Sequence, residues 1–248
     1  MRGARATAPP AVADEIARLY ARLRPTGTVT AHLEQLGADP HRATRAAEAR
    51  RVRELTAHLP DEETAWNARV VSGYHDWCAD PEQGGPDEEL MADGILRAYR
   101  TTGARVVYWG GTGHTAAHQG RATTGKERTE GAVLRAHLGD AYRSIGVTFT
   151  RGQLLWPVAP SSPQLAESAL DSDRLPGTFL LDLRPGTGDP LPPEVARWLT
   201  TPTRTRVIGP HHDAAHDAEY SLSGDTFAHW FDAVAHIREV TPVTFLDT

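Results

Sequence analysis

The chain has 248 residues, of which 40% are hydrophobic and 23% charged, so it is long and apolar enough to enclose a substantial core. Its formal net charge of −6 provides no basic field and argues against nucleic acid as a partner. The single cysteine, Cys78, excludes a disulfide within the chain and a multi-cysteine metal site.

Neither a secretory signal nor a membrane span is predicted. Residues 1–15 contain no apolar core, and no apolar run approaches the length that crosses a bilayer. We therefore expect a cytoplasmic protein that makes no membrane contact.

The predicted elements form one compact domain with three successive parts. These are a disordered tail over residues 1–10, a helical region over 11–103 and an α/β core over 104–248. In the helical region, apolar residues recur at helical spacing between Pro and Gly breaks. The predicted helices cover residues 11–24, 29–36, 42–58, 61–77 and 87–100.

Strands are predicted only after residue 104. They cover residues 105–109, 144–149, 178–184, 206–209 and 233–237. Short helices are predicted over residues 130–138, 164–170, 193–199 and 225–231, and loops over 120–129 and 210–220. Strands that alternate with helices indicate an α/β fold with a mainly parallel sheet and flanking helices.

The most pointed functional signal lies between residues 105 and 114. A β-branched and aromatic run over 105–109 predicts a buried strand, and the glycine-rich turn 110–113 follows it directly. His114 comes next, just past the carboxyl end of that strand, where α/β proteins commonly place their chemistry. We predict that His114 is catalytic and that Trp109 and Gly111 line a substrate site. An ordinary strand connection is the alternative.

The glycines of this turn match neither the dinucleotide fingerprint nor the phosphate-binding P-loop, so no cofactor is predicted. A second substrate-binding pair is Asp182 and Arg184, which alternate along a strand and so face the same side. These two residues could orient a substrate, or they could form a structural ion pair.

A cluster of histidines and aspartates follows residue 210. His211, His212 and His216 have adjacent carboxylates and suggest a metal hydrolase, but the metalloprotease HEXXH pattern is absent. We predict no metal here and keep the metal site as a third hypothesis. His118 stands four residues after His114, and the two would share one helical face only if a helix begins at Thr112. The alternative is one pocket histidine, His114, and one surface histidine, His118.

From about Trp66 to its end, the chain resembles the erythromycin esterase-like family. The motifs that carry the resemblance are Met91-Ala92, Val106-Val-Tyr-Trp109 with His114, Gly131-x-x-Leu134-Arg135-x-x-Leu138-Gly139-Asp140-x-Tyr142-x-x-Ile145-Gly146-Val-x-Phe149, Phe179-Leu-Leu-Asp182-Leu-Arg184, Arg206-Val-Ile-Gly209 and Phe231-Asp232-Ala-x-x-x-Ile237. Their order and spacing match over more than half of the chain.

The resemblance implies a ChaN-like α/β core and hydrolysis of a macrolide lactone ester by histidine-activated water, with no required metal. The family's His-Asn-x-His pattern falls on Gly111, Thr112 and His114, so only its second histidine is present. An Arg-Asp pair of the family falls on Asp87 and Glu88. The family's general base lies in an N-terminal α/β half, whereas this chain starts in the helical middle.

Two functions follow as expectations. The first is a hydrolase of a macrolide or a related ester or lactone. The second is a non-catalytic small-molecule binding module, or a subunit that completes a pocket with another chain. The expected partners are a small-molecule substrate or ligand and either further copies of the chain or a partner chain.

Overall fold

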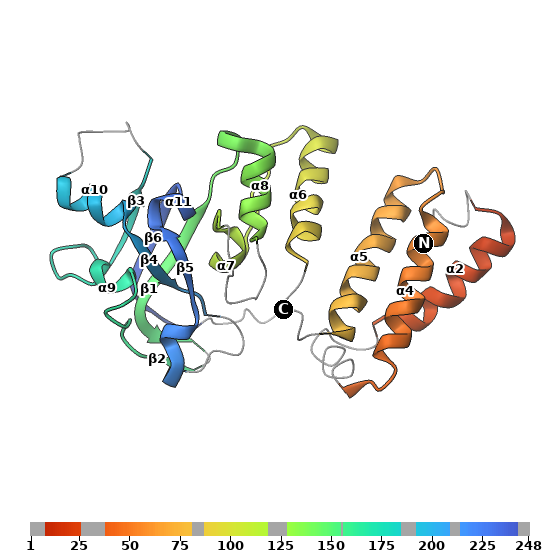
Figure 1. The fold of residues 1–248 in the computed structure, drawn as a ribbon, viewed down its shortest axis with the longest axis horizontal. Coiled ribbons are helices and arrows are strands. Elements are labelled where there is room, and N and C mark those ends of the chain that lie inside the picture. Colours follow the sequence, from red (N-terminus) through yellow and green to blue (C-terminus); the bar gives the residue numbers. More distant parts are fainter. Residues whose placement is uncertain are drawn as a thin grey trace. The chain divides into compact units, whose positions relative to one another are not determined.

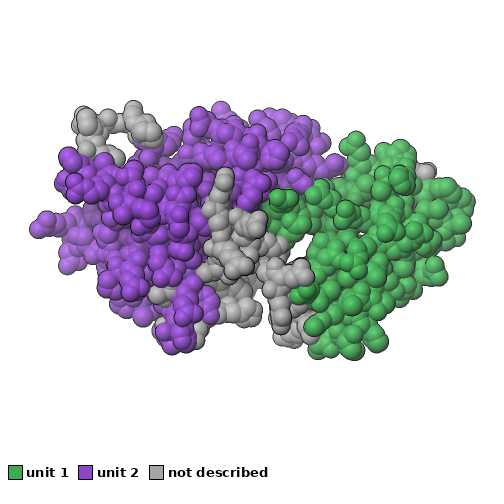
Figure 2. Space-filling view, viewed as in Figure 1, with its two compact units in different colours: residues 1–90 green, residues 91–248 purple. Residues whose placement is uncertain are grey.

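A computed structural model describes residues 8–25, 38–80, 87–118, 128–154, 156–184, 192–208 and 214–242. Contacts between residues divide the chain into two compact units, residues 1–90 and 91–248 (Figure 2). The predicted helical region, residues 11–103, therefore contributes to both units. Of the predicted tail, residues 1–7 lie outside the described residues, and so does the predicted helix over 29–36.

Unit 1 contains the helices α2 (Pro10–Leu23), α4 (Arg42–Thr56) and α5 (Glu62–Ala79) (Figure 1). All three were predicted: α2 from its apolar spacing, α4 from its helix-favouring composition and α5 from the acidic residues at its start. Their shared core is aliphatic, and its buried members are Ile16, Leu19, Leu23, Ala49, Val52 and Ala68. The small side chains of α4 let this helix approach its neighbours closely.

The helix α6 (Glu88–Thr102) extends from the end of unit 1 into unit 2. Asp87 caps it, because its carboxylate accepts a hydrogen bond from the backbone N–H of Leu90 at 3.1 Å. Ala92 and Leu96 of α6 pack with Val133 and Leu134 of α8 (Glu130–Leu138) in one buried cluster. The two helices lie side by side (Figure 1).

Unit 2 is built on a mixed sheet with the strand order β2-β1-β6-β3. The strands are β1 (Ile145–Gln153), β2 (Pro157–Val158), β3 (Thr178–Asp182) and β6 (Ala233–Val240). β1 and β6 are parallel, as predicted for an α/β fold, whereas β2 and β3 run antiparallel to their neighbours. A second, two-stranded sheet pairs β4 (Pro202–Arg206) with β5 (Ser221–Thr226).

Short helices connect and cover these strands. They are α7 (Thr112–Thr115), α9 (Glu167–Leu170), α10 (Pro193–Thr200) and α11 (Phe227–Trp230), with 3-10 turns at η2 (Gly139–Ala141) and η3 (Ala214–Glu219). The main core of unit 2 gathers Phe227, Trp230 and Phe231 around β6, together with aliphatic side chains from α9, α10 and β5. The α/β fold is thus confirmed.

The two faces of the four-stranded sheet differ in burial. On one face, Gly146, Thr148, Val234 and His236 are buried. On the other face, the paired register places Val147 beside Ala235 and Ala235 beside Leu180. Leu180 is 66% exposed and Val147 40% exposed, so this second face is apolar and open.

Two strand predictions were wrong. Residues 105–109 form no strand, and Val107 and Trp109 are 92% and 87% exposed, although their sequence is typical of a buried strand. The run has no ladder partner among the described residues, and β propensity alone does not hold a strand. The strand predicted at 206–209 lies earlier, as β4, and β5 was not predicted.

Within the described ranges, no helix combines the length and the apolar character that a bilayer crossing requires.

Candidate active site

His114 lies on α7, a single helical turn that is fixed at both ends. Gly111 precedes the turn, and its carbonyl accepts hydrogen bonds from the backbone N–H groups of His114 and Thr115. The hydroxyl of Thr112 donates to the carbonyl of Val147 on β1 at 3.1 Å. The carbonyl of Thr115 accepts from Tyr142 Oη at 2.6 Å and from Ser144 Oγ at 2.7 Å. These bonds tie the histidine to the beginning of β1.

The first turn of α8 contacts the end of α7 directly. Thr129 caps α8 by accepting from the N–H of Ala132, and its hydroxyl donates to the carbonyl of Ala116 at 2.5 Å. Gly131 makes this approach feasible, because a Cβ there would overlap the carbonyl of Thr115 and lie 2.5 Å from that of Ala116. The backbone of α8 therefore packs against the turn that carries His114.

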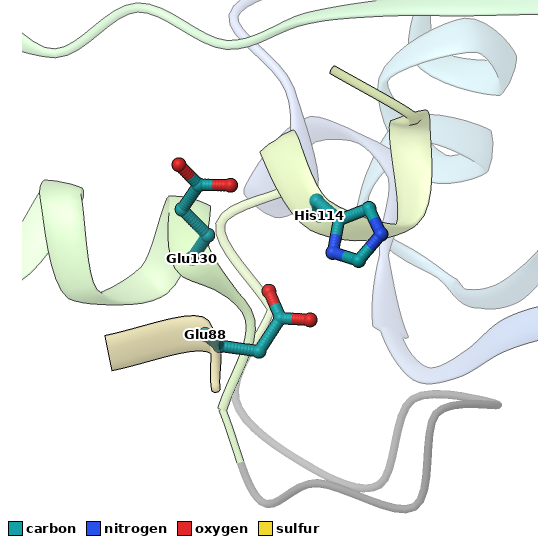
Figure 3. Close-up of side chains that lie close together, drawn as sticks. All are labelled: Glu88, His114 and Glu130. Atoms are coloured by element: carbon teal, nitrogen blue, oxygen red, sulfur yellow. The ribbon is translucent and has the colours of Figure 1, made fainter. Parts of the chain in front are cut away.

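Two carboxylates converge on His114. Glu88 and Glu130 are the first residues of α6 and α8, where a negative charge is stabilised by the helix dipole. Glu130 is fully buried and Glu88 is 3% exposed, while His114 is half-buried. One ligand-type atom from each of the three side chains lies within 4.8 Å of the others (Figure 3). The arrangement provides a titratable ring between two buried acids.

The positions of Glu88 and Glu130 follow from helix packing. Glu88 stands one turn before Ala92 on α6, and Ala92 belongs to the cluster that joins α6 to α8. Glu130 precedes Val133 and Leu134 of the same cluster. Both acids are thus held by the ends of two packed helices, which are more rigid supports than loops.

His118 is buried, so the prediction of a surface histidine was wrong. The helix that begins at Thr112 ends at Thr115, and His118 lies beyond it against Trp230. Its Nδ1 accepts a hydrogen bond from Trp230 Nε1–H at 2.9 Å, which assigns the proton of the neutral ring to Nε2. Burial lowers the pKa of His118 and favours this neutral form. We assign it a structural role.

An aspartate-centred network supports the same region. Asp232 accepts from Arg135 at 2.5 Å, from Arg143 at 2.8 Å and from the N–H of Ser144 at 2.8 Å. Burial raises the pKa of Asp232, but the bonds from Arg135, Ser144 and Arg143 outweigh it, so the net effect lowers the pKa. The network joins α8, the start of β1 and the start of β6.

The predicted substrate residues lie in exposed positions. Asp182 and Arg184 form a bidentate ion pair with N–O distances of 2.9 and 2.5 Å. The bonds from Arg184 lower the pKa of Asp182 to about 2. Trp109 is largely exposed, and Gly111 is the exposed residue before α7. Their substrate-binding role stays a prediction.

Sequence reasoning assigned no role to either acid beside His114. Glu88 was matched to a family position, and Glu130 was noted only as the start of a helix. The available signal was an acidic residue directly after an N-capping residue, in Asp87-Glu88 and Thr129-Glu130. Of the histidine cluster, His211 and His212 lie outside the described residues, and His216 is exposed.

The comparison with protein families settles the family. The model of the family described as erythromycin esterase matches residues 3–240, nearly the whole chain. This chain belongs to the erythromycin esterase family. A comparison with curated protein sequences finds no significant match.

Solved structures share the fold of this erythromycin esterase family member. A protein from Bacillus cereus has a TM-score of 0.66 at 16% identity, with 97% of this chain and 62% of that one covered. A succinoglycan biosynthesis protein has a TM-score of 0.62 at 20% identity, with coverages of 94% and 58%. A mutant of the erythromycin esterase EreC in its open conformation has 0.57 at 10%, with 92% and 60%. The chain spans less than two thirds of the length of each.

Proposed function

We propose that this chain hydrolyses an ester or lactone, with a macrolide or a related compound as substrate and His114 as the catalytic residue. The observation that carries the proposal is the position of His114 beside two buried carboxylates in a member of the erythromycin esterase family. Such a ring can accept a proton from water, because adjacent carboxylates stabilise the imidazolium that forms.

The reaction needs water and one proton carrier. A water oxygen attacks the carbonyl carbon of the ester while His114 takes the proton from that water. The tetrahedral intermediate then breaks its bond to the alkoxide oxygen, which receives the proton from His114. The products are a carboxylic acid and an alcohol, which stay joined in one open molecule when the substrate is a lactone. General-base catalysis of this kind contributes about 10²–10⁴-fold in rate.

The exposed residues suit binding rather than chemistry. Trp109 offers an apolar ring to a macrocycle, which is itself largely apolar. Arg184 already donates to Asp182 through two nitrogens, so a polar substituent of the substrate would have to share this pair. We therefore assign Arg184 and Asp182 to orientation of the substrate and not to bond cleavage.

The direct test incubates the purified chain with erythromycin and follows the product by mass spectrometry. The expected product is heavier than the substrate by one water. The variant His114→Ala is expected to lose about 10²–10⁴-fold of the rate. The matched control is His58→Ala, since His58 is an exposed histidine on the other unit. Equal rates for both variants would remove His114 from the mechanism.

The open sheet face favours the second candidate function, a subunit that completes a pocket with another chain. Ile145 is 56% exposed on this face, next to Ala233 in the paired register, and Leu180 is 66% exposed at its edge. A sheet of an α/β protein usually has both faces covered, and an apolar patch of this kind marks an interaction surface. We propose further copies of the chain or a partner chain as the cover.

Sedimentation of the purified chain tests this second candidate. Concentration-dependent association that Leu180→Lys abolishes would support it. A monomer at all concentrations would exclude self-association and leave a separate partner chain as the proposal. Leu175→Lys serves as the control, since Leu175 is also exposed but lies outside the sheet.

A further inference from the structure

The chemistry of the Glu88–His114–Glu130 cluster extends beyond a hydrogen-bonded histidine. Two carboxylates are buried with ligand atoms no more than 4.8 Å apart. Two negative charges at this separation repel each other where water is excluded. Positive charge nearby therefore stabilises the pair, and a bound cation is one source of it.

The donor set suits a divalent transition metal. Two carboxylate oxygens and one imidazole nitrogen are ligands that Zn²⁺ and Mn²⁺ both accept, and three protein ligands leave further positions open. Mg²⁺ fits less well because it prefers an all-oxygen octahedron. A divalent ion would also neutralise the two carboxylate charges completely.

The geometry requires only small side-chain movements. Metal–ligand bonds of about 2.1 Å in a tetrahedral site place the ligand atoms about 3.4 Å apart. The three atoms already lie within 4.8 Å of one another, so rotation of the half-buried His114 ring and the glutamate side chains can close the gap. The backbones of α6, α7 and α8 need not move, and Figure 3 shows that the side chains come from three separate elements.

We propose that Glu88, His114 and Glu130 bind one divalent transition-metal ion, Zn²⁺ or Mn²⁺. Binding of the ion depends neither on the substrate nor on the proposed ester hydrolysis. An ion bound to His114 would occupy the ring that the proposed hydrolysis uses as a base, so the bound ion is expected to slow that reaction.

The test begins with protein that has been stripped by a chelator and dialysed. Titration with ZnCl₂ and with MnCl₂, followed by calorimetry, is expected to show one equivalent of ion bound. Co²⁺ in place of zinc would report the coordination number through its visible spectrum. His114→Ala and Glu130→Gln are each expected to weaken metal binding about 100-fold or more. Loss of a residue that hydrogen-bonds to a ligand already lowers metal affinity by about 10–100-fold, and loss of the ligand itself should lower it at least as much.

Two controls separate this site from others. His229→Ala removes an exposed histidine that pairs with Asp225, and it should leave binding unchanged. The triple variant His211→Ala, His212→Ala, His216→Ala tests the other histidine cluster and should also bind normally. If wild-type protein binds no ion, or if His114→Ala binds as well as wild type, the proposal is overturned.

Thermal unfolding distinguishes a loss of metal binding from a general loss of folding in the variants. Added Zn²⁺ should raise the Tm of wild type and not that of Glu130→Gln. An equal rise in both proteins would contradict the site.

Hydrolysis assays keep the two proposals distinguishable. Metal binding with no hydrolysis of any ester would overturn the proposed function but leave the site intact. Hydrolysis by chelated, metal-free protein would support the proposed function, and faster hydrolysis with Zn²⁺ bound would contradict the expectation that the ion occupies the catalytic ring.

Discussion

The helices of unit 1 and the core of unit 2 bury different kinds of side chains. The cluster shared by α2, α4 and α5 consists of aliphatic residues such as Ile16, Leu19 and Val52. Unit 2 buries aromatic rings and several charged or titratable groups, among them Glu130, Glu167 and His236, whereas the described part of unit 1 buries His75 and Glu88. The free energy from apolar contacts does not depend on pH. Each buried titratable group, in contrast, adds a pH-dependent contribution to the free energy of unfolding.

The polar groups of the two units also have different partners. In unit 1, the buried hydroxyl of Thr56 donates to the carbonyl of Val52 in its own helix. In unit 2, the ring of His236 lies between the hydroxyls of Thr148 and Thr150 on the neighbouring strand, at 3.0 and 3.2 Å. These buried bonds of unit 2 join separate elements, and so do the bonds from Thr112, Tyr142 and Ser144 that hold the turn of His114. Perturbations of the two units should differ accordingly.

Substitution of Gly131 is expected to have the largest effect on stability. A side chain in Gly131→Val would overlap backbone carbonyls of α7, which cannot move aside as a flexible side chain can. We expect a loss of about 3 kcal/mol or more in the free energy of unfolding, at the upper end of overpacking. Urea denaturation measures it. Gly177→Ala is the control, because its Cβ would meet nothing within 4 Å, and a similar loss in both would refute the close-contact explanation.

Substitution in the aliphatic core of unit 1 is expected to have the next largest effect on stability. Ile16 is 1% exposed, so Ile16→Ala removes buried methyl groups and leaves a cavity. The expected cost is about 3 kcal/mol, with no dependence on pH. Hydrogen exchange should show the loss of protection in α2, α4 and α5. An equal loss throughout residues 91–248 would mean that the two units unfold together.

Unit 1 was also the part that sequence predicted best. The spacing of Ile16, Leu19 and Leu23 identified α2, and Asp61 identified the start of α5, where it caps the N–H groups of Glu63 and Thr64. Helical periodicity and capping are local properties, so a single segment contains all the information that is needed.

In unit 2 the decisive information is not local. The run 105–109 has the composition of a strand, yet a strand also needs a neighbour in the ladder, which composition cannot report. The cluster at His114 brings together Glu88, His114 and Glu130, which stand 26 and 16 positions apart along the chain. His114 could be predicted from its glycine-rich turn, but the acids beside it depend on how α6 packs on α8.

The third largest effect on stability is expected from Glu167, and it depends on pH. Burial raises the pKa of Glu167 to about 7, although bonds from Thr205 Oγ1 and from the backbone N–H of Arg206 oppose the shift. Between the unfolded pKa, about 4.3, and the folded pKa, the folded protein holds a proton that the unfolded chain releases. The stability from this group is therefore complete at low pH and declines as the pH rises towards 7 and above.

Glu167→Gln should remove this decline. The free energy of unfolding of wild type minus that of the variant is expected to fall by about 2 kcal/mol from pH 5 to pH 8. Urea denaturation at a series of pH values measures the difference, in which contributions from other groups cancel. Glu239→Gln, an exposed site, is the control. A constant difference between wild type and Glu167→Gln would show that Glu167 has an ordinary pKa in the folded protein.

Substitution of a helix-capping residue is expected to change stability less than the substitutions above, and the caps of the two units differ in their partners. Asp61 caps α5 from a half-buried position, and its carboxylate accepts hydrogen bonds from Glu63 and Thr64 in the first turn of that helix. The buried Thr129 caps α8 and also donates to the carbonyl of Ala116, beyond the end of α7. Thr129→Val should therefore cost about 1–2 kcal/mol, as for loss of a strong cap, and should also lower metal binding or hydrolysis at His114.

Thr129→Ser separates the hydroxyl from the shape of the side chain. Because serine keeps the hydroxyl, it should restore both the stability and the activity that Thr129→Val loses, whereas Asp61→Ala should lower stability without changing the chemistry at His114. Urea denaturation and the hydrolysis assay on the same three proteins measure both effects. If Thr129→Ser behaved like Thr129→Val, the methyl group and not the bond to Ala116 would be what couples α8 to α7.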